Sequence, residues 1–70
     1  MDRIGFIGAG TVGTALAITL AREGYHVAAV ASRTRASAEA LAAQVPGCAV
    51  WDKAEEVAGA ADLVFITTPD

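Results

Sequence analysis

The sequence is poor in cysteine, proline and aromatic residues: its 70 residues include one cysteine, two prolines and 6% aromatics. The lone Cys48 cannot form an internal disulfide, so a reducing cytoplasm is the expected location. No histidine or cysteine cluster has the spacing of a metal site, and we therefore expect no metal.

Positive charge is also scarce, because five Lys and Arg residues stand against eight Asp and Glu, for a net charge of −3. This balance argues against attraction to nucleic acid or anionic lipid, so any bound anion must be held locally. The uncharged stretch 4–21 has about the length of a membrane span, but four glycines interrupt it and Asp2 stands where a basic flank is expected. We predict no nucleic-acid partner and no membrane segment.

Short apolar runs alternate with helical patterns along the whole chain. The patterns predict strands over 4–7, 26–31, 48–51 and 62–67, and helices over 11–23, from 34 to 45 and over 53–60. Val12, Leu16 and Leu20 form the expected apolar stripe of the first helix, and Asp52 with Glu55 is the expected capping pair of the third.

This alternation of strands and helices predicts the α/β class, with a Rossmann-type doubly wound parallel sheet in the strand order 3-2-1-4. The fourth strand would then lie at an open, apolar edge. We therefore interpret residues 1–70 as the N-terminal part of a dinucleotide-binding domain, with the substrate domain absent from this chain.

The stretch "GAGTVG" at 8–13 lies where the first strand gives way to the first helix. In this context Gly8 would allow the tight turn, Gly10 would admit a pyrophosphate to the backbone, and Gly13 would let the helix approach the strand. The N–H groups at the start of the helix would then face the phosphates. The alternative is that these glycines serve turning and packing alone, which leaves Gly10 without a reason.

The end of the second predicted strand bears on the choice of coenzyme. A domain that prefers NAD usually has an acid about 20 residues past the glycines, and here Ser32 stands at that place with no acid over 31–35. Arg33 and Arg35 follow, and arginine suits bidentate contact with phosphate. The alternative is a helix start with solvated arginines.

The remaining candidates lie at the end of the fourth strand, where Thr67, Thr68 and Pro69 either contact the coenzyme or form a plain loop. His26 is expected at the opposite end of the sheet, and Cys48 is expected to pack rather than react. No catalytic residue is predicted.

The stretches "IGFIGAGTVGTAL", "VASR" and "AADLVFITTPD" resemble the coenzyme domain of the 6-phosphogluconate-dehydrogenase-like reductases. That superfamily includes the pyrroline-5-carboxylate reductases, the ketopantoate reductases and the deazaflavin-dependent NADP oxidoreductases. The sequence is most similar to a branch with a helical domain of unknown function after the Rossmann-like domain. The resemblance implies an NADP(H) site with the pyrophosphate at Gly8, Ala9, Gly10, Thr11, Val12 and Gly13, the 2′-phosphate at Ser32, Arg33 and Thr34, and the coenzyme along Thr67, Thr68 and Pro69.

The function implied by the resemblance is an NADP(H)-dependent oxidoreductase that moves a hydride between nicotinamide and a small C=O or C=N substrate. The substrate groups, the catalytic residues and the contacts of a homodimer would come from the later helical domain. A non-catalytic nucleotide-sensing or interaction module is the main alternative, because fold does not fix function. An S-adenosylmethionine-dependent transferase is a further alternative, although Ser32 stands where it would commonly have an acid.

Overall fold

The computed structural model describes residues 2–67, so Thr68 and Pro69 of the predicted site lie outside the described residues. Within that range strands and helices alternate without exception. They are β1 (Arg3–Ile7), α1 (Thr11–Arg22), β2 (His26–Ala31), α2 (Arg35–Gln44), β3 (Ala49–Trp51), α3 (Ala54–Ala60) and β4 (Leu63–Ile66).

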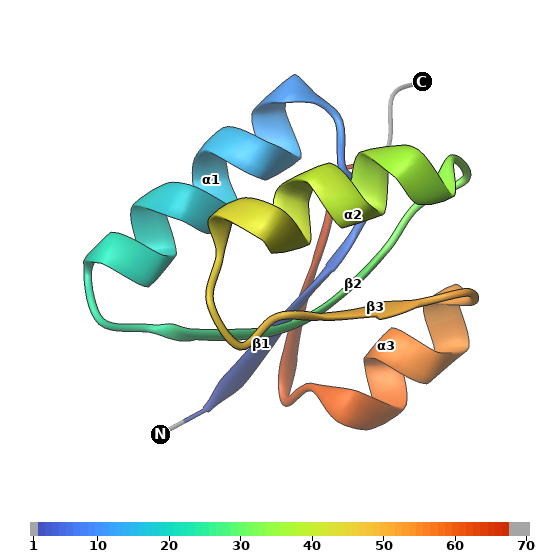
Figure 1. Cartoon of the computed structure of the whole chain (residues 1–70). Helices are drawn as coiled ribbons and strands as arrows, with labels where there is room; N and C mark the ends of the chain where they lie inside the picture. Colours follow the sequence, from blue (N-terminus) through green and yellow to red (C-terminus); the bar gives the residue numbers. More distant parts are fainter. Residues whose placement is uncertain (1, 68–70) are drawn as a thin grey trace.

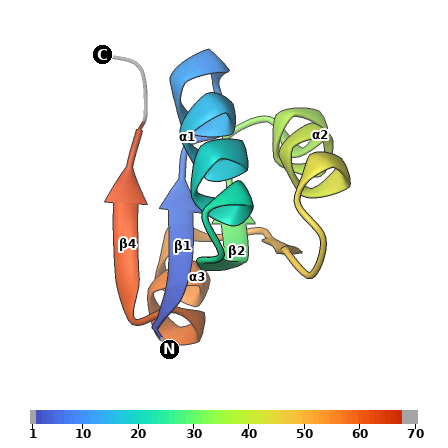
Figure 2. The same cartoon turned by 90° about the vertical axis from the view of Figure 1, so that its left-hand side faces the viewer.

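The four strands form one parallel sheet in the order β3-β2-β1-β4, which confirms the predicted topology. Helices α1 and α2 cover one face of the sheet and α3 covers the other (Figure 1). The carboxyl ends of β1 and β4 point the same way, and α1 starts at that end (Figure 2). This edge of the sheet is where doubly wound folds bind ligands.

Both faces of the central strands are buried, as their nearly continuous apolar sequences predict. On the α1/α2 face, Phe6 and Val30 are fully buried and Phe6 stacks on Phe65 with 5.4 Å between ring centroids. On the α3 face, Ala29 packs with Val57. At the edge of the sheet, Ile66 of β4 is 72% exposed.

Two details of the predicted helices are wrong. Val12 of the predicted apolar stripe is 72% exposed, whereas Leu16 and Leu20 pack against the core, and the fully buried residues of α1 are the small Gly13 and Ala17. Helix α3 is capped one residue later than predicted: the Glu56 carboxylate accepts a hydrogen bond from the Lys53 N–H at 3.0 Å. Asp52 lies one residue before the N-cap, and its carboxylate pairs with Arg35.

Gly5 has a packing role that the sequence did not reveal. It lies in β1 under α3, and a Cβ built on it would lie 2.6 Å from Val57 Cγ1 and 2.9 Å from the Ala61 Cβ. Contacts this short would force α3 away from the sheet. The absence of a side chain at Gly5 therefore sets how closely this helix packs.

We expect Gly5→Ala to lower the free energy of unfolding by about 1–3 kcal/mol, the usual cost of overpacking a core. Urea denaturation monitored by circular dichroism measures it. The matched control is Gly59→Ala, since a Cβ at Gly59 meets no atom within 4 Å and alanine favours a helix. An equal stability for Gly5→Ala and the wild type would contradict the close packing of α3 on β1.

Candidate functional site

The turn between β1 and α1 uses its first and last glycines structurally, as predicted. Gly8 has φ +100°, a conformation that favours glycine, and its N–H donates to the Ala31 carbonyl oxygen at 2.8 Å. A Cβ at Gly13 would lie 2.5 Å from Thr67 Oγ1 and 2.8 Å from the Gly8 carbonyl oxygen. Close packing of α1 therefore occurs against the Gly8 peptide and the end of β4.

Gly10 differs from the other two because no atom of residues 2–67 explains its lack of a side chain. It is exposed, has φ −76°, and a Cβ built on it meets nothing within 4 Å in this range. Neither turning nor packing against residues 2–67 requires glycine at this position. Glycine is among the residues that favour an N-cap, and it also leaves the open space that the motif assigns to a ligand.

Helix α1 begins directly at this glycine with its positive end uncompensated. Gly10 is the N-cap, no side chain caps it, and the first turn has no acidic residue. Thr11 and Val12 are exposed there, with the N–H groups that a helix start leaves without helical partners. The combination of unpaired donors and a positive dipole end favours a bound anion.

The residues after β2 lie beside the glycine turn. A hollow of about 190 Å³ is lined by both segments, namely Gly8, Ala9, Gly10, Ser32, Arg33, Thr34 and Ser37. The structure thus brings the two main predicted groups of site residues together. The sequence analysis did not predict Ser37 as a site residue. It follows Thr34 by three residues on a predicted helix, so the two residues share a helix face.

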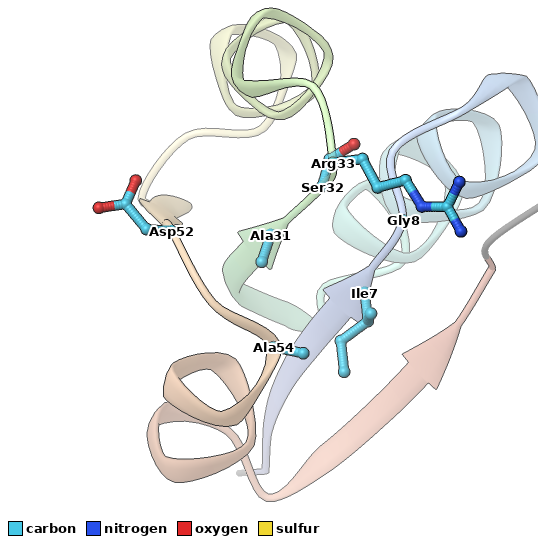
Figure 3. A pocket seen from close by; sticks show the side chains of 7 residues that line it. All are labelled: Ile7, Gly8, Ala31, Ser32, Arg33, Asp52 and Ala54. Atoms are coloured by element: carbon cyan, nitrogen blue, oxygen red, sulfur yellow. The ribbon is translucent and has the colours of Figure 1, made fainter.

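A neighbouring hollow of about 300 Å³ extends from Gly8 toward β3 and is lined by Ile7, Gly8, Ala31, Ser32, Arg33, Asp52 and Ala54 (Figure 3). Arg33 extends from the end of β2 toward Gly8, and Asp52 lies at the far side. Sequence reasoning missed Ile7, Ala31, Asp52 and Ala54. The meeting of the carboxyl ends of adjacent parallel strands at one edge could have indicated the first three.

The two arginines of the "SRTR" stretch have different surroundings. Arg35 forms ion pairs with Asp52 and, at 3.2 Å through Nε, with Glu39. Arg33 is exposed and makes no ion pair within residues 2–67. Since Arg35 is paired with two carboxylates, Arg33 is the cation of this stretch best placed to meet an anion in the hollow.

Thr67 contacts the glycine turn directly. Its hydroxyl donates to the Gly8 carbonyl oxygen at 2.8 Å, and its N–H donates to the Ile7 carbonyl oxygen at 2.8 Å. The end of β4 is therefore tied to the turn. Contact between Thr67 and a coenzyme stays a prediction.

Cys48 lies directly before β3 and His26 at the start of β2, both away from this edge of the sheet. Asp52, which lies at the edge, pairs with Arg35. Desolvation of the half-buried Cys48 thiol raises its pKa to about 11, so the thiolate is scarce near neutral pH. His26 is exposed at the start of β2, at the opposite edge of the sheet. Within residues 2–67, no group of three or more His, Cys, Asp or Glu side chains could hold a metal ion. No helix in the same range is both long and apolar enough to cross a membrane.

The chain matches a family model and is similar to a solved structure. The family model described as NADP oxidoreductase coenzyme F420-dependent matches residues 3–70. The crystal structure of a Bacteroides fragilis protein provisionally assigned as an NADP oxidoreductase is similar, with a TM-score of 0.86 and 37% sequence identity. The match covers 97% of this chain and 26% of that one, so the chain spans about a quarter of the length of this relative. No curated protein matches the chain significantly. With an α/β fold, a glycine turn and a family match over nearly its whole length, the chain belongs to the coenzyme F420-dependent NADP oxidoreductase family.

Proposed function

We propose that this chain binds NADP(H) and forms the coenzyme-binding part of an oxidoreductase. The observation that carries the proposal is the hollow shared by the glycine turn and Ser32–Arg33–Thr34, whose lining includes no carboxylate from residues 2–67. An uncompensated helix start and an exposed guanidinium meet there. This is a site for two separate anionic groups of one ligand.

The two groups are assigned by the donors that surround them. We place the pyrophosphate at residues 8–13, where N–H groups are available and Gly10 leaves open space. We place the 2′-phosphate at Ser32, Arg33 and Thr34, since a guanidinium binds phosphate well and the hydroxyls add hydrogen bonds without repulsion. The family description and the name of the similar structure, which both refer to NADP, support this coenzyme.

The reaction proposed for the whole enzyme is transfer of a hydride between nicotinamide and a small C=O or C=N substrate. When bound, the coenzyme supplies the hydride chemistry, and the role of this chain is to hold and orient it. We place the substrate-binding and catalytic groups outside these residues, in keeping with the quarter of the similar structure that the chain covers. A cytoplasmic location and a homodimer formed through a further domain belong to the same proposal.

The proposal is tested by following backbone amide signals in NMR spectra during titration with NADPH. We expect the largest shifts at residues 8–13 and 32–34, and no comparable shifts with S-adenosylmethionine, the ligand of the alternative transferase class. Shifts confined to other residues, or an equal response to S-adenosylmethionine, would contradict the proposed site.

A further inference from the structure

Two carbonyl groups of the glycine turn are held by threonine hydroxyls. Thr67 Oγ1 donates to the Gly8 carbonyl oxygen at 2.8 Å, and Thr14 Oγ1 donates to the Ala9 carbonyl oxygen at 3.3 Å. The first bond joins residues that are 59 positions apart in the chain, at the ends of the adjacent strands β1 and β4. Both are side-chain bonds and are separate from the backbone pairing of β1 with β4.

These bonds have a consequence for the N–H groups of the turn. A peptide bond is planar and trans, so its C=O and N–H point in opposite directions. Because Thr67 holds the Gly8 carbonyl, the Ala9 N–H of the same peptide points away from Thr67. A rotation of that peptide would replace a donor by a carbonyl oxygen, which repels an anion.

Thr67 is itself firmly placed. Its N–H continues the β1–β4 pairing by donating to the Ile7 carbonyl oxygen, and its side chain is half-buried. The hydroxyl occupies space that a side chain at residue 13 would take, since a Cβ on Gly13 would lie 2.5 Å from Thr67 Oγ1. Gly13 therefore leaves room for the hydroxyl that holds Gly8.

We propose that Thr67 is a positioning residue that orients the Gly8–Ala9 peptide, so that the Ala9 N–H faces the pyrophosphate of the coenzyme. This inference rests on the proposed function and deepens it. It gives Thr67 a role that acts through the turn and requires no contact between its side chain and the coenzyme. Both NADPH and NADH carry the pyrophosphate, so the role is the same for both.

The test is the substitution Thr67→Val, which keeps the shape of the side chain and removes the hydroxyl. We expect the Kd values for NADPH and NADH to rise together by about three- to tenfold, the fold-change that corresponds to one hydrogen bond. Thr67→Ser keeps the hydroxyl and should restore affinity. Thr19→Val is the matched control, because Thr19 Oγ1 donates to the Ala15 carbonyl oxygen at 2.9 Å on the exposed side of α1.

Each outcome of this test bears on the proposal. Unchanged affinity in Thr67→Val, an equal loss in Thr19→Val, or a loss limited to NADPH would overturn it. The last result would place Thr67 at the 2′-phosphate. Thermal denaturation of each variant identifies a temperature at which all of them are folded. Titrations at that temperature show that a loss of affinity is not caused by unfolding.

The ligand-free NMR spectrum separates this inference from the proposed function. In Thr67→Val we expect the Ala9 amide signal to move and Thr67→Ser to return it toward its wild-type position. If the wild type bound neither coenzyme, the proposed function would fail. If the Ala9 amide signal did not move in Thr67→Val, the positioning role of Thr67 would fail independently of coenzyme binding.

Discussion

Arg33→Ala is expected to remove most of the preference for NADPH over NADH and to leave the affinity for NADH nearly unchanged. Arg33 is exposed beside the glycine turn and makes no ion pair within residues 2–67, so its guanidinium is available for a 2′-phosphate. Hydrogen bonds to charged groups contribute about 1.5–3 kcal/mol each. One or two of them correspond to a preference of at least about tenfold.

The structure supplies a matched control for this substitution. Arg35 lies two residues away, but it pairs with Glu39 and Asp52. We therefore expect Arg35→Ala to leave the preference between the coenzymes close to that of the wild type. Titration of each variant with both coenzymes at one moderate salt concentration provides the comparison, since salt screens exposed charges. Equal effects of Arg33→Ala and Arg35→Ala would show that only the overall charge matters.

The opposite change is expected from Ser32→Asp in the same titrations. A carboxylate at the end of β2 would repel the 2′-phosphate and accept a hydrogen bond from the ribose hydroxyl of NADH. The preference should then reverse in favour of NADH. A variant that still prefers NADPH as strongly as the wild type would place the 2′-phosphate away from Ser32.

Gly10→Val is expected to abolish coenzyme binding while the chain stays folded. A Cβ at Gly10 meets no atom of residues 2–67 within 4 Å and φ is −76°, so the backbone accepts a side chain there. The added methyl groups would occupy the space in front of the helix start that the pyrophosphate needs. Calorimetric titration with NADPH measures the loss, and circular dichroism verifies the fold.

Gly59→Val is the control for this second substitution, because Gly59 also has open space around a built Cβ and lies in α3, which lines the sheet face opposite α1 and α2. It should bind NADPH as the wild type does. Retained binding in Gly10→Val would mean that the pyrophosphate does not approach this part of the turn.

Local patterns were sufficient to predict the fold and to place the two main groups of candidate residues side by side, at the glycine turn and after β2. That these residues bind a coenzyme stays a prediction. The alternation of strands and helices predicted the order 3-2-1-4, and the glycine spacing predicted the tight turn at Gly8 and the close packing at Gly13. These features depend on residues close together in the chain or on general rules of chain connection. They can therefore be predicted from the sequence alone.

The features that were missed depend on pairs of residues far apart in the sequence. The lack of a side chain at Gly5 is explained by Val57 and Ala61, and Asp52, the predicted cap of α3, pairs with Arg35, which lies 17 residues earlier. The hydroxyl bond from Thr67 to Gly8 spans 59 residues. No local pattern specifies which distant side chain will lie beside a given residue.

The most direct test of the central claim is the ratio of the dissociation constants of the wild-type chain for NADH and NADPH. Both are measured in one buffer at fixed, moderate salt. We predict that NADPH binds at least about tenfold more tightly, because only NADPH presents a 2′-phosphate to Arg33. Equal dissociation constants for the two coenzymes would contradict the assignment and leave Arg33 as a solvated arginine near the start of α2.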